Sequence, residues 1–131
     1  MSIKYEKADD IKKQAEEIIE KLSWNHILLD HVAFIRSYGS KSRGTIARCH
    51  ALGKAIQVGM GLKKGFYVIE VISEKFDKLT KEEQIKVIIH ELMHIPKSFG
   101  GGFKHHNIVN EKSVNEIYNN YRKLKEKKKW F

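Results

Sequence analysis

Hydrophobic side chains recur at the three- and four-residue spacing of an amphipathic helix in three stretches of the chain. The first stretch runs from about residue 6 to residue 22 and carries two aspartates near its start, where the helix dipole favours negative charge. The second begins at Thr80, and the third begins near Ser113, which would cap it together with Glu116. The repeating apolar positions are Ala8, Ile11, Ala15, Ile18, Ile19 and Leu22, then Ile85, Ile88, Ile89 and Leu92, and finally Val114, Ile117, Tyr118, Tyr121 and Leu124. The pattern therefore predicts three helices, each with one face to bury.

Short β-branched and aromatic runs between these helices predict strands. Residues 30–36 and 66–73 are two such runs, and residues 63–65 before the second would form the turn of a hairpin. Glu70 interrupts the second run, which predicts that one face of that strand reaches solvent or a cleft. Residues 45–59 fit neither period, so helix, strand and bulged strand remain open there. We expect an α+β fold, with a small mixed or antiparallel sheet of about three strands packed against the N-terminal, central and C-terminal helices.

Length and composition predict one globular domain over residues 1–131, because 41% of the residues are hydrophobic and 31% are charged. No apolar run approaches the roughly 20 residues that span a membrane, and the first ten residues lack the apolar centre of a signal peptide. The one cysteine, Cys49, excludes an intramolecular disulfide and suggests a reducing compartment. We therefore expect a cytoplasmic protein with no membrane partner.

The net charge of +9 suggests that the chain could attract an acidic partner. Part of this charge lies in the basic run 122–129, which is typical of a solvated helix end. A second basic cluster surrounds the Ser- and Gly-rich stretch 37–44, which we expect to be a loop. Its members are Arg36, Lys41, Arg43 and Arg48. No nucleic-acid-binding motif accompanies the cluster, so solvated surface is the favoured interpretation and nucleic-acid binding the alternative.

The second predicted helix contains the motif His-Glu-x-x-His at residues 90–94. Residues four apart on a helix lie one above the other, so His90 and His94 would present two imidazoles to one point, as a zinc ion requires. Glu91 lies about 100° around the helix from His90, within reach of a water on that ion. In this motif the metal lowers the pKa of the water and the glutamate accepts its proton. The motif predicts a hydrolytic Zn²⁺ site with two histidine ligands and Glu91 as the general base.

A catalytic zinc site takes three protein ligands, so one ligand must come from outside the motif. Pro96 and the three glycines that follow it predict a turn that returns the chain over the end of the helix. We favour His105 as the third ligand and keep His106 as a near-equal alternative, which would otherwise line the cleft or stabilise the oxyanion. Glu111 or Glu116 is a further alternative, because sites with two histidines and one glutamate also exist.

The remaining histidines and the cysteine have simpler interpretations. His26, His31 and His50 belong to no ligand pattern, and we expect them to be ordinary surface or core residues. The pair Cys49-His50 suggests a second metal site or a nucleophile, but a cysteine without a partner pattern favours burial. These residues are therefore not assigned to the predicted site.

Two runs of this sequence resemble a known group of proteins. His90-Glu-Leu-Met-His-Ile-Pro96 followed by Ser98-Phe-Gly-Gly-Gly-Phe-Lys-His-His106 is similar to the small zinc metallopeptidases of archaea and phages. The preceding strand-to-helix run over residues 68–79 also looks like that group, so the resemblance covers roughly residues 31–106. More distantly, the chain is similar to SprT-like proteases, in which a strand precedes the motif helix and a later histidine completes the site.

The resemblance implies a minimal zincin fold, in which one strand of a small sheet edges the substrate cleft and helices back the sheet. It also implies four roles: His90 and His94 are two ligands, Glu91 is the base, and either His105 or His106 is the third ligand. The metzincin pattern does not apply, because Lys97 and Gly100 stand where its glycine and third histidine would be.

The leading hypothesis is a zinc-dependent metallopeptidase with a protein or peptide substrate, an endopeptidase rather than an exopeptidase. The substrate would add as an extended strand to the exposed edge of the sheet. The alternative is a basic nucleic-acid-associated module in which the metal only stabilises the fold, or which acts on DNA-bound protein. A third hypothesis is a metal-dependent hydrolase of non-peptide bonds, because the same site can activate water for other electrophiles.

Overall fold

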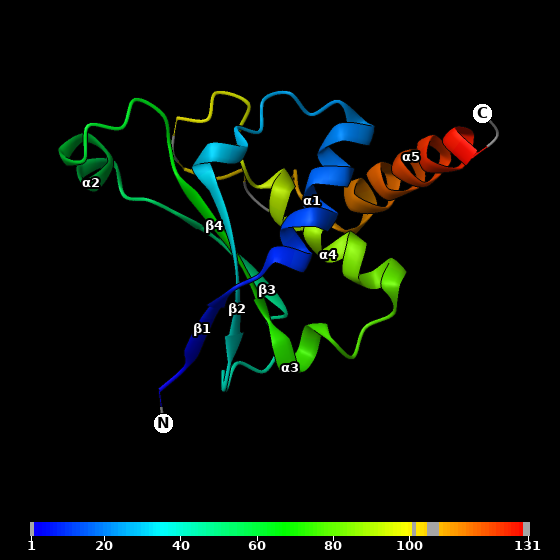
Figure 1. The fold of residues 1–131 in the computed structure, drawn as a ribbon, viewed down its shortest axis with the longest axis horizontal. Coiled ribbons are helices and arrows are strands. Elements are labelled where there is room, and N and C mark those ends of the chain that lie inside the picture. Colours follow the sequence, from blue (N-terminus) through cyan, green and yellow to red (C-terminus); the bar gives the residue numbers. More distant parts are fainter. Residues whose placement is uncertain (1, 101, 105–107, 130–131) are drawn as a thin grey trace.

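The computed structural model describes residues 2–100, 102–104 and 108–129, and these residues form an α+β fold, as the sequence predicts (Figure 1). In chain order the elements are β1 (Lys4–Lys7), α1 (Asp9–Leu22), the short 3₁₀ helix η1 (Leu29–His31), β2 (Val32–Tyr38), β3 (Ala47–Ala51), α2 (Lys54–Gly59), β4 (Tyr67–Ile72), α3 (Ser73–Phe76), α4 (Lys81–Met93) and α5 (Glu111–Lys129). The three long helices, α1, α4 and α5, gather on one side of the sheet, whereas α2 stands apart from them (Figure 1).

The four strands form one mixed sheet in the order β1-β2-β4-β3. The central strands β2 and β4 run parallel, with Phe34 opposite Ile69, and each pairs antiparallel with an edge strand, β1 or β3. Side chains alternate between the two faces of a strand, so Phe34, Ile69 and Val71 point to the same side and are buried in the core. β3 forms one edge of the sheet, and no other strand of the described residues pairs with its outer side.

The apolar stripes of the long helices supply the other half of the core. Ile88, Ile89 and Leu92 of α4 are almost fully buried, and Tyr118 and Tyr121 of α5 pack into the same cluster. The predicted capping box of α4 is confirmed, because both of its hydrogen bonds form between Thr80 and Glu83. The amphipathic pattern therefore predicted which face of α4 is buried.

The N-terminal prediction is partly wrong. Residues Lys4–Lys7 form strand β1, and the first helix begins at Asp9 rather than near residue 6. All four residues of β1 are exposed, so the strand shows no apolar alternation that could reveal it in the sequence. The sheet consequently has four strands in place of the expected three or so.

The ambiguous stretch 45–59 contains both candidate structures, since β3 ends at Ala51 and α2 begins at Lys54. β3 does pair with β4 as expected. The two strands are connected by residues 52–66, which include α2, in place of a tight turn at residues 63–65. Glu70 was expected to mark a face of β4 that reaches solvent or a cleft. Val68 on that face is half-buried, but Glu70 itself does not reach solvent. Its side chain is buried, and a carboxylate oxygen lies 2.8 Å from Nε2 of His50 on β3.

The start of the last helix also differs from the prediction. α5 begins at Glu111, and the side chain of Asn110, in place of Ser113, accepts a hydrogen bond from a first-turn amide. Leu124 is partly exposed at 38%, so the buried stripe of α5 ends at Tyr121. Within the described residues, no helix is both long enough and apolar enough to cross a bilayer.

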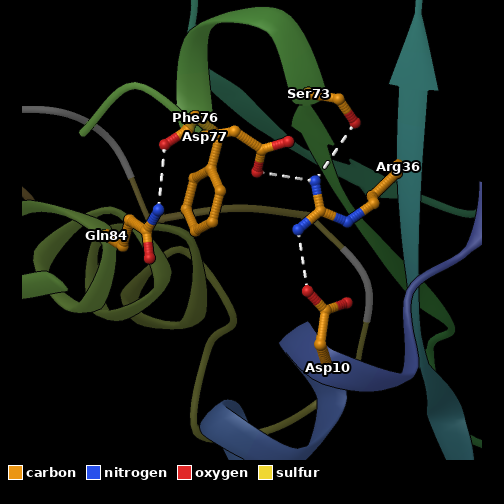
Figure 2. A network of polar contacts seen from close by, with 6 residues as sticks. All are labelled: Asp10, Arg36, Ser73, Phe76, Asp77 and Gln84. Atoms are coloured by element: carbon orange, nitrogen blue, oxygen red, sulfur yellow. Dashed lines mark hydrogen bonds and ion pairs between the residues drawn. The ribbon is translucent and has the colours of Figure 1, made fainter. Parts of the chain in front are cut away.

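One arginine ties the sheet to the helices that precede the motif. The guanidinium of Arg36 on β2 donates to Asp10 of α1 at 2.7 Å, to Asp77 at 2.9 Å and to Ser73 of α3 at 3.2 Å (Figure 2). The aromatic ring of Phe76 lies against the same guanidinium. The backbone carbonyl of Phe76 accepts a hydrogen bond from the side chain of Gln84 of α4. This network fixes where α4 starts relative to the sheet, and therefore where its far end meets the cleft.

Candidate metal centre

The His-Glu-x-x-His motif lies at the C-terminal end of α4. His90 and Glu91 belong to the last turn, and His94 is the residue that follows the helix, still with helical backbone angles. The centroids of the two imidazole rings are 4.9 Å apart, with the rings almost edge to face. Because the apolar stripe holds the helix against the core, both rings are presented together at its end. The helical backbone therefore brings the two imidazoles close enough to share a metal ion.

The orientation of His94 is fixed by the chain that returns over the helix end. Nδ1 of His94 lies 2.6 Å from the backbone carbonyl of Lys104, and the amide of Lys104 donates to the carbonyl of His94 at 2.9 Å. A carbonyl only accepts, so Nδ1 is the donor in this contact, and Nε2 is the ring nitrogen through which this tautomer could bind a metal. The predicted fold-back after Pro96 is confirmed as far as Lys104. This backbone contact could not be predicted from the sequence, because every residue type has a carbonyl.

Glu91 is a buried carboxylate at the bottom of the site. It is 7% exposed, and its Oε2 lies 3.9 Å from Nε2 of His90. Burial raises the pKa of Glu91 to about 7, because the charged carboxylate loses its hydration. A neighbouring cation would act in the opposite direction. A carboxyl with its pKa near neutrality can both accept and return a proton, which is the requirement for general acid–base chemistry.

These three side chains line a cleft of about 920 Å³. One wall is formed by residues 44–49, which include the start of the edge strand β3, and the other by α4 and the beginning of α5. Arg48, Lys86 and Lys104 bring positive charge to the cleft, and Glu83 and Glu111 bring negative charge beside that of Glu91. The resemblance implies that a strand edges the cleft, but the sequence did not assign that strand to β3, because it left residues 45–59 open between helix and strand.

Cys49 is part of this wall, but its thiol is unreactive. Burial, together with the charge of Glu91, raises its pKa to about 12. The thiol therefore stays protonated at neutral pH, and a protonated thiol is a poor nucleophile and a poor metal ligand. Cys49 serves as a small apolar side chain of the cleft wall, half-buried rather than buried.

A catalytic zinc site takes three protein ligands, and His90 and His94 are the two candidates that the described residues bring together. The favoured third ligand, His105, and its alternative, His106, lie outside the described residues. Of the carboxylate alternatives, Glu111 lines the cleft, whereas Glu116 lines a separate depression on the surface of α5. Among the residues that the structure describes, no three His, Cys, Asp or Glu side chains lie together as a ligand group. The two imidazoles fit a transition metal, and a further donor is required to complete its coordination.

The other histidines that the structure describes, His26, His31 and His50, do not line this cleft and have their own contacts. Nδ1 of His31 lies 3.2 Å from the carbonyl of Gly65, and Nε2 of His50 lies 2.8 Å from Glu70. His26 packs near the ring of Trp24, and burial lowers its pKa. Each therefore has a local structural role in the fold.

A protein-family model described as "Putative phage metallopeptidase" matches residues 3–129, which is almost the whole chain. No curated protein and no solved structure matches the chain significantly. The family match favours a metallopeptidase over a nucleic-acid-associated module, and a metallopeptidase requires a metal cofactor. The extent of the match, together with the paired imidazoles and the buried glutamate in the cleft, shows that the chain belongs to this phage metallopeptidase family.

Proposed function

We propose that this protein is a zinc-dependent endopeptidase whose ligands include His90 and His94 and whose general base is Glu91. The observation that carries the proposal is the pair of adjacent imidazoles beside a buried carboxylate, in a cleft walled by an edge strand. His105 is the proposed third ligand, with His106 and Glu111 as its alternatives. Zinc suits this donor set because it accepts imidazole nitrogen readily and does no redox chemistry of its own.

The reaction needs a nucleophilic water, a polarised carbonyl and a route for one proton. A zinc ion in the site would supply Lewis-acid polarisation of the scissile carbonyl and a water of lowered pKa. Glu91 accepts the proton of that water as the oxygen attacks the carbonyl carbon, and then donates it to the amine nitrogen as the C–N bond breaks. The hydrogen bond from Nδ1 of His94 to Lys104 holds that imidazole in the tautomer that ligation requires.

The substrate is proposed to bind as an extended strand along the outer side of β3. Main-chain hydrogen bonds to an unpaired strand edge bind a peptide without requiring a particular sequence. The small side chains of Ala47 and Cys49 on the cleft wall leave room for those of the substrate. A peptide bound along a strand edge extends past both sides of the site, which favours cleavage within a chain over removal of terminal residues.

The test is zinc content by elemental analysis together with cleavage of an unfolded protein substrate by wild type and by Glu91→Gln. We expect about one zinc per chain in both proteins and a loss of cleavage of roughly 10²–10⁴-fold in the variant, because an amide cannot accept the proton. Glu83→Gln is the matched control, since it alters a glutamate of the same helix that also lines the cleft. Glutamine can keep the capping bond of Glu83, so this variant should cleave as wild type does.

Equal cleavage by wild type and Glu91→Gln would show that the base is wrongly assigned. Failure of the wild type to take up any transition metal would remove the metal centre itself. Endopeptidase action is checked with a substrate whose two termini are blocked, from which internal fragments are expected. If only substrates with a free terminus are cut, the protein is an exopeptidase.

A further inference from the structure

The short helix α2 buries a polar side chain and exposes its aliphatic ones. Its buried side chain is the polar Gln57, which is 2% exposed and donates to the carbonyl of Leu62. Its aliphatic side chains point outward: Ile56 is 58% exposed, Val58 64% and the adjoining Met60 63%. A surface helix ordinarily buries its apolar residues and exposes its polar ones. Large aliphatic side chains gathered at an exposed site mark a surface that contacts an apolar environment.

These side chains stand at the tip of an excursion from the sheet. The excursion comprises residues 52–66, between the edge strand β3 and β4, and α2 lies at the periphery of the molecule (Figure 1). Its base is closed by backbone hydrogen bonds from Leu52 to Phe66 and from Gly65 to Phe99. The aliphatic tip is therefore held in place by the sheet.

The charged residues of the excursion itself are all lysines. Residues 31–69 contain seven Lys or Arg residues and no Asp or Glu. Three of the seven, Lys54, Lys63 and Lys64, flank the tip within the excursion itself. Basic residues beside exposed aliphatic ones have the composition of a peripheral contact with anionic lipid, in which lysines meet phosphate groups and aliphatic side chains enter the interface.

We propose that residues 52–66 dock on the surface of an anionic lipid bilayer. Ile56 and Met60 lie one turn apart on one side of α2, and Val58 lies about 200° around the helix from Ile56. A fluid lipid interface can surround side chains that project from a convex tip in different directions. An apolar small ligand, by contrast, ordinarily binds in a concave site. Nucleic acid would use the lysines and leave the aliphatic side chains in water. This proposal departs from the expectation of no membrane partner, which was drawn from the lack of a spanning segment. A peripheral contact does not need such a segment.

The experiment is co-sedimentation of the full chain with vesicles of phosphatidylcholine containing about 30% phosphatidylglycerol, and with vesicles of phosphatidylcholine alone. We expect binding to the anionic vesicles, and binding at least about tenfold weaker to the neutral ones. The triple variant Ile56→Ser, Val58→Ser, Met60→Ser should bind at least about tenfold more weakly than wild type. The triple variant Lys54→Gln, Lys63→Gln, Lys64→Gln should lose binding to a similar extent.

Matched controls make the same changes elsewhere. Tyr5→Ser, Leu28→Ser and Leu124→Ser remove three other exposed hydrophobic side chains, and Lys112→Gln, Lys123→Gln and Lys127→Gln remove three charges from α5. Both control triples should bind as wild type does. A separate variant, Val58→Trp in a chain that also carries Trp24→Phe and Trp130→Phe, reports on insertion at residue 58 alone. Its fluorescence should shift to the blue when anionic vesicles are added and not with neutral ones.

The docking proposal does not rest on catalysis, so Glu91→Gln should bind vesicles as wild type does even if it cleaves nothing. Equal vesicle binding by wild type and both tip variants would overturn the proposal, as would an unshifted Val58→Trp spectrum with anionic vesicles. Absence of vesicle binding, with a dimer that the aliphatic triple variant converts to a monomer, would assign the tip to a second copy of the chain. If the wild type binds DNA and the lysine triple variant loses that binding while the aliphatic triple variant keeps it, Lys54, Lys63 and Lys64 form a nucleic-acid site.

Discussion

Helices α4 and α2 bury opposite kinds of residue. α4 turns Ile88, Ile89 and Leu92 into the core and presents its histidines at the cleft, whereas α2 turns Gln57 inward and leaves its aliphatic residues outside. α4 contacts α1, α5 and β3, so its apolar face has a partner within the chain. α2 lies between β3 and β4 at the periphery, and its buried side chain is that of Gln57. Hydrophobic pattern predicts burial only where the fold supplies a surface to bury against.

The largest expected effect concerns one isoleucine of each helix, which is buried in α4 and exposed in α2. Ile89→Ala in α4 should lower the free energy of unfolding by about 2–5 kcal/mol, because it leaves a cavity in the core. Ile56→Ala in α2 should change it by less than about 0.5 kcal/mol, because that side chain is already in water. Urea denaturation of the metal-free protein measures both. Equal losses in the two variants would mean that the aliphatic tip of α2 is packed in solution.

The next effect concerns the polar side chain that each helix buries. Burial raises the pKa of Glu91 from 4.5 to about 7, so the folded metal-free protein holds this proton more tightly than the unfolded chain does. The stability linked to the proton is fully present below pH 4.5 and is lost as the pH rises through about 7, a loss of about 3 kcal/mol. Relative to wild type, Glu91→Gln should therefore gain about that much stability over this interval.

Gln57→Met is the control for this titration, because the neutral amide that it replaces has no proton to lose in this range. Its difference from wild type should be the same at each pH. Saturating zinc should suppress the pH dependence due to Glu91, since a neighbouring cation favours the ionised carboxylate. Denaturation curves between pH 4 and pH 8, with and without zinc, supply the measurement. If the difference in free energy of unfolding between wild type and Glu91→Gln is the same at every pH, Glu91 is hydrated in solution.

The smallest effect concerns the helix starts. α4 has a complete capping box, so Thr80→Ala should cost about 1 kcal/mol. α2 begins after Gly53, which offers no side-chain cap, and a Cβ built there meets nothing within 4 Å. Gly53→Ser should therefore stabilise the protein by a few tenths of a kcal/mol. Thermal unfolding distinguishes the two signs. Destabilisation by Gly53→Ser would indicate that the start of α2 is held by a contact that the serine disturbs.

The same contrast explains how much of the fold the sequence predicted. The stripe of α4, its capping box and the α+β class follow from local pattern, and the structure agrees with each. β1 was missed because all of its residues are exposed, and α2 because its apolar residues follow no buried face. The start of α5 was misassigned because Asn110 and Ser113 are both good caps, and only the structure shows which one accepts the bond.

The candidate site divides in the same way. His90, Glu91 and His94 were predicted because their spacing on a helix brings them together whatever the rest of the fold does. The wall formed by β3, the carbonyl of Lys104 against His94, and the burial of Glu91 were not predicted. Each of these depends on a residue that is distant in the sequence, or on a backbone atom that every residue has.

The sequence by itself determined the helix that carries the motif, the face of that helix that is buried, and the two imidazoles at its end, because these follow from a period of 3.6 residues. Only the tertiary structure decided which strand walls the cleft, which nitrogen of His94 contacts the carbonyl of Lys104 and how far the pKa of Glu91 rises. Those properties arise from contacts between segments that are far apart in the chain, and no local pattern of side chains encodes them.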